Sequence, residues 1–289
     1  MFISNNKGVA MKTFYRPEMN VQGNTSFSPS AGKPKQFIEF LLQHNLPLNI
    51  EDGFLPVSRQ DLSMAHDEMM VNGILDLKLE NGFGNRLPEV AKSLPFTSGS
   101  FYAASEWAIK SKENAFSPTS GFHHAGFKRV AGFCTFNGLL VSALKLKSKG
   151  LVQKIGIVDI DNHYGDGTEN IINHLRLNWI KHYTFGAEGI GASNAEQWLS
   201  GLEKKLKAFK DVDIIFYQAG GDVHISDPLG GVLTSEQMKR RDELVFSTFK
   251  KLGIPVVWNL AGGYQDPLEK VLELHKTTYE IALHHSANV

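Results

Sequence analysis

The stretch Ile155-Gly156-Ile157-Val158-Asp159-Ile160, which runs directly into Asp161-Asn162-His163, indicates the fold of this chain. It is an almost uninterrupted apolar run that ends in acidic and imidazole side chains. The runs at 213–219 (DIIFYQA) and 255–261 (PVVWNLA) have the same character, and each is also followed by a polar motif. Apolar runs of this length are typical of strands that are covered on both faces. The sequence therefore predicts a buried parallel sheet.

Helices are expected between these strands, so the fold class is α/β. In the second half we expect the strands and helices to alternate in the order 154–160, 168–177, 182–185, 195–209, 213–219, 235–251, 255–260 and 266–284. In the less regular first half we expect helices at 34–44, 98–110 and 136–147, and loops at 79–94 and 113–129. Strands that alternate with helices predict a doubly wound, mostly parallel sheet with helices on both faces.

The composition describes one neutral, well-filled domain. No linker-like segment divides the 289 residues, so we expect a single domain over 1–289, with residues 1–10 as a candidate disordered segment. Thirty basic residues balance thirty acidic ones, which gives no bulk case for binding nucleic acid or an anionic membrane. Lys239, Arg240 and Arg241 are interpreted as a solvated helix face. No run approaches the roughly 20 apolar residues of a membrane span, and the single cysteine, Cys134, fits a cytoplasmic location.

Asp161, His163 and Asp222 have the residue types and positions of metal ligands. Asp161 and His163 are two residues apart in an extended segment, so both side chains face the same way. Asp222, in Gly220-Gly221-Asp222, follows another predicted strand, and ligands of doubly wound sheets bind at the carboxyl ends of the strands. Three protein ligands leave one position open, as in catalytic zinc sites. Each residue alone would more often be a turn former or a helix cap.

The adjacent histidines His123 and His124, in Gly121-Phe122-His123-His124-Ala125, are candidates for proton transfer. In an extended loop their rings would diverge. Each ring needs a partner on its far nitrogen, and Asp159 and Asp166 are the natural candidates. Different partners would give the two histidines different pKa values. Asp166 also begins the capping-box pattern 166–169, so the capping role and the histidine-partner role both stay open at this point.

Two glycine-containing motifs complete the set. Gly262-Gly263-Tyr264 ends a predicted strand in a phenol that could donate a hydrogen bond to an oxyanion; the alternative is a turn followed by a core tyrosine. Gly132-Phe133 precedes an apolar helix, and Phe133 would line a channel or belong to the core. Cys134 is interpreted as a small buried hydrophobic residue. The histidines at positions 174, 182, 275, 284 and 285 are expected on surfaces or helix faces.

Taken together, these motifs resemble the histone deacetylase family, within the arginase/deacetylase superfamily, over nearly the whole chain. The resemblance extends to 65–68 (AHDE), 132–137 (GFCTFN), 227–231 (DPLGG) and 261–265 (AGGYQ). The chain is most similar to the small bacterial members and the class IV-like branch. The resemblance implies an eight-stranded parallel sheet flanked by helices, and a zinc-dependent amidohydrolase that removes acetyl or longer acyl groups from acylated lysine side chains.

Carried over position by position, the resemblance implies specific roles. Asp161, His163 and Asp222 would bind one zinc ion. His123 and His124 would form the base and acid pair, with Asp159 and Asp166 orienting them. Tyr264 would stabilise the tetrahedral intermediate, and Gly132 and Phe133 would line the acyl-lysine tunnel. Relatives also bind K⁺ through the backbone near Asp159, Asp161 and His163, and this second ion is an open expectation here.

Departures from the family pattern leave the substrate open. Tyr164 replaces a histidine that is not a ligand, and the loop 186–194 offers no evident second aromatic wall for the tunnel. The substrate is expected to be an acyl-lysine protein or peptide, or an acetylpolyamine or other small acylated amine. A catalytically silent acyl-lysine binding module is the alternative of another class. A two-metal arginase-like hydrolase is disfavoured, because Gly165 and His224 stand where further carboxylates would be needed. The oligomeric state is not predicted.

Overall fold

The computed structural model describes residues 10–23 and 26–286 of the chain; most of the segment 1–10, expected to be disordered, lies outside them. In the described residues, seven parallel strands form one sheet, in the order β2-β1-β3-β7-β6-β4-β5. The strands are β1 (Met11–Phe14), β2 (Leu48–Glu51), β3 (Ala115–Phe116), β4 (Ile155–Asp159), β5 (Ile180–Thr184), β6 (Ile214–Gln218) and β7 (Val256–Asn259). The α/β class is confirmed, with seven strands in place of eight.

Nine α-helices lie within the described residues. They are α1 (Lys33–Gln43), α2 (Arg59–Ser63), α3 (Glu68–Leu75), α4 (Pro88–Ser111), α5 (Gly138–Ser148), α6 (Asp166–His174), α7 (Ala195–Lys207), α8 (Ser235–Leu252) and α9 (Glu269–Ser286). Short 3₁₀ turns occupy Pro17–Met19, Pro29–Ala31, Phe185–Ala187 and Ala192–Asn194. Within this part of the chain, none of the helices is long and apolar enough to cross a membrane.

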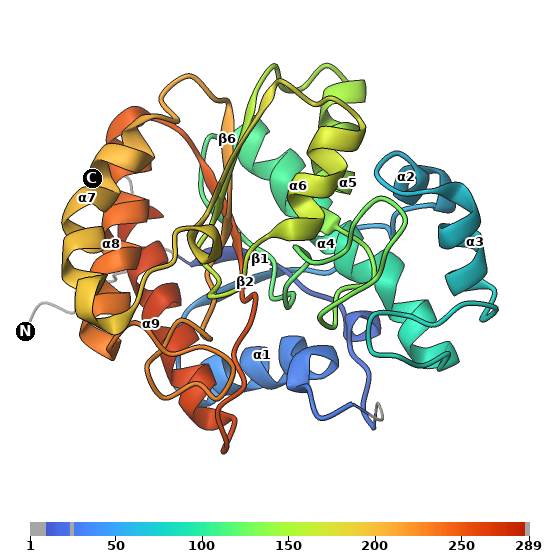
Figure 1. Ribbon diagram of the computed structural model, residues 1–289, viewed down its shortest axis with the longest axis horizontal. Helices are drawn as coiled ribbons and strands as arrows, with labels where there is room; N and C mark the ends of the chain where they lie inside the picture. Colours follow the sequence, from blue (N-terminus) through green and yellow to red (C-terminus); the bar gives the residue numbers. More distant parts are fainter. Residues whose placement is uncertain (1–9, 24–25, 287–289) are drawn as a thin grey trace, which may run out of the picture.

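The sheet separates two hydrophobic cores (Figure 1). Successive side chains of a strand point to opposite faces of the sheet, so neighbouring residues of the central strands belong to different cores. Ile157 and Phe216 pack on the side of α4 and α5. Val158 and Tyr217 pack on the side of α7, α8 and α9. The central strands β4, β6 and β7 are buried on both faces, which explains their almost continuous apolar sequences.

The elements of the second half agree with the prediction to within a few residues. In the first half the expected helices 34–44 and 136–147 agree with α1 and α5, and other elements differ. The strands β1, β2 and β3 were not predicted: they contain four, four and two residues, too few to show a period. The expected loop at 79–94 is wrong in its last part, because α4 begins at Pro88. Proline is well tolerated at the first position of a helix, and Val90 and Leu94 are buried in the core.

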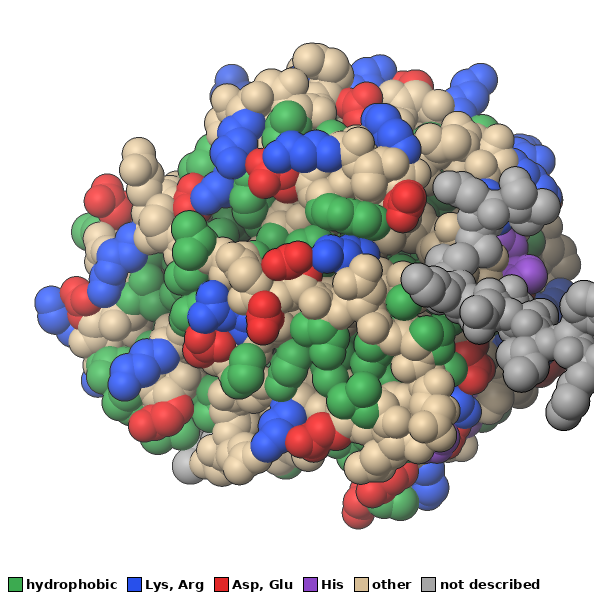
Figure 2. All heavy atoms as spheres, turned by 180° about the vertical axis from the view of Figure 1, so that it is seen from behind, with side chains coloured by type: hydrophobic (Ala, Val, Ile, Leu, Met, Phe, Trp, Pro, Cys, Tyr) green, Lys and Arg blue, Asp and Glu red, His purple; other side chains and the backbone are tan. Residues whose placement is uncertain are grey.

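Acidic and basic side chains are interspersed over the face of the molecule opposite to that in Figure 1 (Figure 2).

The expectation that Arg241 belongs to a solvated face of α8 is wrong. Arg241 is completely buried and pairs with the buried Asp242, with Nε at 2.9 Å from Oδ1. Arg241 stands three residues after Met238 and four before Val245, so it lies on the apolar stripe of α8. A buried guanidinium must be paired, and Asp242 also accepts hydrogen bonds from Tyr217 and Thr278.

Candidate active site

The predicted motifs meet at the carboxyl ends of adjacent strands. Asp159, the last residue of β4, is in register with Gln218 of β6 and Thr184 of β5. Gln218 is in register with Asn259, the last residue of β7. Because parallel strands end at one edge of the sheet, the loops that follow them converge. A cavity of about 260 Å³ at this edge is lined by Ser30, Gly121, His123, His124, Gly132, Phe133, Cys134, Asp161, His163, Gly262 and Tyr264.

Asp161, His163 and Asp222 form a compact group in which one possible ligand atom of each residue lies within 4.8 Å of the others. His163 Nδ1 lies 2.9 Å from Asp222 Oδ2 and 3.2 Å from Asp161 Oδ1. Both carboxylates are buried. Burial, together with the charge of Asp161, raises the pKa of Asp222 to about 7. Two desolvated carboxylates side by side are unfavourable without a cation, so this donor set fits a bound metal ion.

Glycines allow the two carboxylates to approach each other. A Cβ atom on Gly262 would lie 2.5 Å from Asp222 Oδ2 and 2.8 Å from Asp161 Oδ2, closer than atoms pack. The Gly262 N–H also donates to Asp161 Oδ2 over 2.9 Å. On the other side, the Gly220 carbonyl accepts a hydrogen bond of 2.8 Å from the buried Arg241 guanidinium. The strand-end glycines therefore act as close-approach positions around the metal-binding group.

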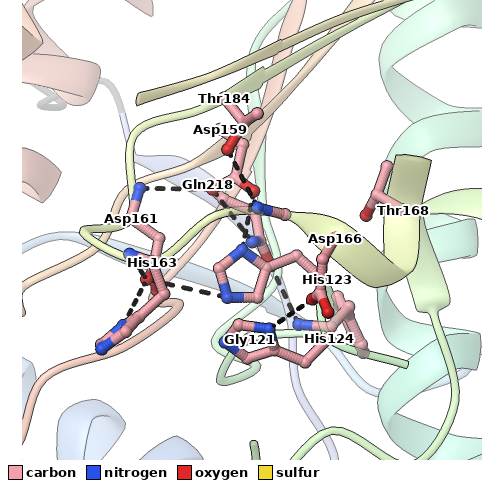
Figure 3. Close-up of polar contacts among 12 residues, drawn as sticks. Gly121, His123, His124, Asp159, Asp161, His163, Asp166, Thr168, Thr184 and Gln218 are labelled. Atoms are coloured by element: carbon pink, nitrogen blue, oxygen red, sulfur yellow. Dashed lines mark hydrogen bonds and ion pairs between the residues drawn. The ribbon is translucent and has the colours of Figure 1, made fainter. Parts of the chain in front are cut away.

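The histidine pair lies beside this group, and each ring contacts its predicted partner (Figure 3). His123 Nδ1 is 2.7 Å from Asp159 Oδ2, and His124 Nδ1 is 2.7 Å from Asp166 Oδ1. The carboxylates can only accept hydrogen bonds, so Nδ1 of each ring carries the proton and Nε2 is left for the cavity. Asp166 makes no capping hydrogen bond at the start of α6. Its side chain binds His124 and Arg129 instead.

The two rings do not diverge as an extended loop would require. Residues 122–125 form a turn, in which Ala125 N donates to the Phe122 carbonyl over 3.2 Å. The ring centroids are consequently 4.1 Å apart, with an angle of 53° between the planes. Because of the turn, both imidazoles line the same cavity.

The surroundings move the pKa values of the two histidines in opposite directions. Burial opposes protonation of His123, but the charges of Asp159 and Asp161 outweigh it and raise its pKa to about 9. For His124, burial and the charge of His123 prevail over Asp166, and its pKa is lowered. The Asp166 carboxylate is itself partly buried, yet its hydrogen bond from His124 and the Arg129 charge lower its pKa. The pair is thus electrostatically unequal.

Tyr264 lies on the wall of the same cavity, and burial raises its pKa well above the usual range, so the phenol stays protonated. Its backbone N–H donates to the buried Asp227 over 2.7 Å. Phe133 packs 5.8 Å from the Tyr264 ring, and Phe27 and Phe83 pack against the other sides of Phe133. Phe27 and Phe83 are therefore the aromatic neighbours of Phe133, in place of the residues of loop 186–194.

Gly132 and Phe133 both have positive φ, of 51° and 63°. At Gly132 a Cβ would lie 2.3 Å from His124 Cδ2, so no larger residue fits there. Cys134 is buried as expected, and burial raises its pKa to about 12. A second cavity of about 510 Å³ shares Ser30, Gly121 and Phe133 with the first and is lined by further aromatic and hydroxyl side chains.

Several residues around the site were not assigned a role from the sequence. His66 is buried, and burial lowers its pKa to about 4, so the ring is neutral. Its Nδ1–H donates to the Gly126 carbonyl over 2.9 Å, and Nε2 accepts from Asn137 N over 2.8 Å, so one ring joins both ends of loop 126–137. Lys33 is also fully buried and donates to the Ala261 carbonyl over 3.0 Å. Burial of a lone lysine or histidine has no sequence signal of its own.

His275 corrects another expectation, because it is buried rather than on a surface. Among the residues that the structure describes, neither of its ring nitrogens has a hydrogen-bond partner, and burial lowers its pKa well below the usual value. It packs behind the metal-binding group, where its ring would contact a Cβ on Gly221. His174 and His284 are exposed, as expected.

Comparison with known proteins gives one consistent assignment. Residues 32–178 match the histone deacetylase domain model. An uncharacterised protein of Picosynechococcus is 31% identical over 56% of this chain and 60% of its own length, so the match spans less than two thirds of that relative. Histone deacetylase 2 of Arabidopsis thaliana is 24% identical over 77% of this chain and 68% of that protein.

A "probable deacetylase" of Methanothermobacter thermautotrophicus is 22% identical over 89% of this chain and 86% of that protein. Among solved structures, the HDA15 HD domain superposes with a TM-score of 0.76 at 18% identity, covering 97% of this chain and 91% of that one. This likeness establishes the shared fold. Since the family model matches half of the sequence and the fold agrees, this chain belongs to the histone deacetylase family.

Proposed function

We propose that this protein is a zinc-dependent deacylase that hydrolyses the amide bond of acylated lysine side chains. One observation carries the proposal: Asp161 and His163, both imidazoles of the histidine pair and Tyr264 line one cavity, and the buried Asp222 contacts His163 to complete the metal-binding group. A metal-binding group next to a base, an acid and an oxyanion donor is what amide hydrolysis by an activated water requires.

Asp161, His163 and Asp222 would hold the metal. Two carboxylates and one imidazole suit zinc, with a coordination position left for water or substrate. Zinc bound there would polarise the acyl carbonyl and lower the pKa of the attacking water to about 7.

The unequal histidines divide the proton transfers. His124, whose pKa is lowered, has a neutral ring with Nε2 free to take a proton from the attacking water. His123, which is buried and donates from Nδ1 to Asp159, would keep its proton and hold positive charge next to the reacting carbonyl. The proton taken from water is then returned from the pair to the lysine nitrogen as the amide C–N bond breaks. The products are a carboxylic acid and a free amine.

Tyr264 would donate its phenolic hydrogen to the oxyanion of the tetrahedral intermediate. Its pKa is raised by burial, so the proton is present at neutral pH. Phe133 and its aromatic neighbours Phe27 and Phe83 would enclose the lysine methylenes. The adjoining cavity, which shares Ser30, Gly121 and Phe133 with the first, would be the place for an acyl group larger than acetyl.

The test is release of free acid from a panel of acetyl-lysine peptides, longer acyl-lysine peptides and acetylpolyamines, with zinc content measured on the same sample. We expect turnover that is lost on chelation and restored by zinc, with one zinc per chain. Turnover of acetylpolyamines alone would reassign the substrate to small amines. One bound zinc without turnover of any substrate would favour a binding module, and no bound zinc would refute the metal site.

A further inference from the structure

A buried amide, the side chain of Gln218, lies directly behind the site and has no role in the mechanism above. Gln218 is the last residue of β6, is completely buried, and stands in register between Asp159 of β4 and Asn259 of β7. Residues two and four positions before it, Phe216 and Ile214, pack on the α4–α5 side of the sheet, so its side chain projects to that side as well. There it meets the loop that carries His123.

The partners of Gln218 determine how its amide is oriented. The Phe122 backbone N–H can only donate, and it lies 3.0 Å from the amide oxygen Oε1. The Asp159 carboxylate can only accept, and its Oδ1 lies 3.2 Å from the amide nitrogen Nε2. Asn259 adds a second donor to Oε1, at 3.3 Å. No flipped orientation satisfies these contacts, so Gln218 donates to the carboxylate and accepts from the loop.

These contacts close a ring of interactions around one imidazole (Figure 3). Phe122 precedes His123 in the chain, His123 binds Asp159, Asp159 accepts from Gln218, and Gln218 accepts from Phe122. The backbone position of His123 and the carboxylate that orients its ring are therefore set by the same amide. Asn259 extends the arrangement, since its Nδ2 also donates to the Ser120 carbonyl over 3.2 Å.

The other dyad has a different support. The second oxygen of Asp166 binds the guanidinium of Arg129, which is about half exposed. Asp159 instead has a neutral amide donor and the backbone N–H of Asp161, at 3.2 Å from Oδ1. A neutral donor fixes a carboxylate in place without bringing a positive charge to it.

We infer that Gln218 is a positioning residue for the proposed hydrolysis, which holds Asp159 and the His123 loop in one fixed arrangement. This inference rests on the proposed function for its kinetic consequence and on the hydrogen-bond geometry for the rest. Gln218 acts through Asp159 and His123 and touches no reacting atom. Its loss should lower the rate of the chemical step and leave substrate binding almost unchanged.

The test compares Gln218→Met, which keeps the volume but removes all three hydrogen bonds of the amide, with Thr13→Val as the matched control. Thr13 is a buried polar residue of the same sheet, on β1, whose side chain interacts with the Met11 carbonyl and with Tyr279 and with none of the residues that line the site. Both variants are made in the full chain, loaded with zinc, and assayed with an acetyl-lysine peptide. Melting temperature and zinc content are measured on each sample.

For Gln218→Met we expect kcat to fall about tenfold with KM within twofold and with zinc content unchanged. This is smaller than the roughly 10²-fold to 10⁴-fold effects of general acid–base groups themselves, as suits a residue that acts indirectly. Thr13→Val should leave kcat unchanged. An unchanged kcat in folded Gln218→Met, or a fall that follows loss of zinc, would overturn the inference. In an Asp159→Asn background, where only the contact with the His123 loop remains to be lost, Gln218→Met should cause a smaller loss of kcat than in the unaltered protein, and a fully multiplied loss would also overturn the inference.

A spectroscopic readout separates this inference from the proposed function. The Nδ1 protons of His123 and His124, each on a hydrogen bond of 2.7 Å to a carboxylate, should give two distinct downfield NMR signals. Gln218→Met should move the His123 signal and not the His124 signal, even if no acyl substrate is ever turned over. Equal shifts of both, or of neither, would refute the positioning role. Should the methionine variant not fold, Gln218→Asn keeps a buried amide, withdraws it from Asp159 and is judged by the same signals.

Discussion

The two histidine–aspartate dyads stand side by side, and their surroundings differ in almost every respect. The side chains of His123 and Asp159 are 3% and 0% exposed. Those of His124 and Asp166 are 20% and 32% exposed. The first dyad is supported by the buried amide of Gln218, and the second by the half-exposed guanidinium of Arg129. Yet both hydrogen bonds between imidazole and carboxylate measure 2.7 Å.

The same hydrogen bond between imidazole and carboxylate can therefore serve two tasks, which are to hold a fixed charge and to prepare a histidine that accepts a proton. The buried dyad is held by several fixed partners and keeps its proton, so we expect it to contribute chiefly stability and a fixed charge. The partly exposed dyad has a lowered histidine pKa, so it retains a neutral ring that can accept a proton. Activity and stability should therefore depend on different dyads.

The largest effect is expected from removing the proposed base. His124→Ala should lower kcat about 10³-fold to 10⁴-fold, the upper range for a general acid–base group. His123→Ala should lower kcat about 10²-fold, because the charge it supplies is only one part of the stabilisation. Steady-state kinetics of the two zinc-loaded variants on one acetyl-lysine peptide measures the ratio. Equal losses, or a larger loss at His123, would contradict the division of roles.

Stability should show the opposite order. Asp159→Ala leaves three buried donors without an acceptor, on His123, Gln218 and the Asp161 backbone. Each unsatisfied donor costs about 1–3 kcal/mol, so the free energy of unfolding should fall by about 3 kcal/mol or more. Asp166→Ala should cost less than about 1 kcal/mol, because water can replace its partners. Urea unfolding at equal zinc loading gives both values, and a larger cost at Asp166 would refute the assignment.

A third prediction concerns Tyr264, which is proposed to stabilise the oxyanion while the two dyads transfer or hold protons. Tyr264→Phe removes the proposed oxyanion donor and should reduce kcat about 100-fold, the order found for one such donor. The ring and its packing against Phe133 stay, so KM and stability should change little. If the two groups act separately, the fold losses in kcat of Tyr264→Phe and His123→Ala should multiply in the double variant. An unchanged rate in the single variant would remove Tyr264 from the mechanism.

The smallest effect is expected at Arg129. Its ion pair with Asp166 joins two partly exposed groups, and such pairs contribute about 0–1 kcal/mol. Arg129→Gln should therefore change kcat by less than about fivefold and leave stability nearly unchanged. Salt should weaken activity of the unaltered protein slightly and that of the variant less, because the exposed pair is screened. A loss as large as that expected for Gln218→Met would show that the exposed dyad needs an equally rigid support.

Much of the site could be predicted because its residues follow buried strands. Asp159 ends β4, Asp161 and Asp222 follow β4 and β6 within a few residues, and strand ends of a parallel sheet meet at one edge. The strands β1 to β3 could not be predicted in the same way. β3 has two residues, and its pairing with β7 depends on Val257 and Trp258, which are far away in the chain. Arg241 was expected to be solvated because a charged residue is usually exposed. It is buried because its guanidinium pairs with the buried Asp242.

Local sequence thus determined which chemical groups this protein has at its strand ends, since apolar runs, glycines and acidic residues have local signals. It also determined the fold class, because the alternation of strand and helix is a property of neighbouring residues. Tertiary structure alone decided how the groups differ: which histidine is buried, which carboxylate meets an amide or a guanidinium, and that Gln218 and Asn259 lie behind the site. The physical reason is that pKa values and hydrogen-bond partners depend on the local dielectric and on contacts between distant residues, such as Phe122 with Gln218, which no short stretch of sequence contains.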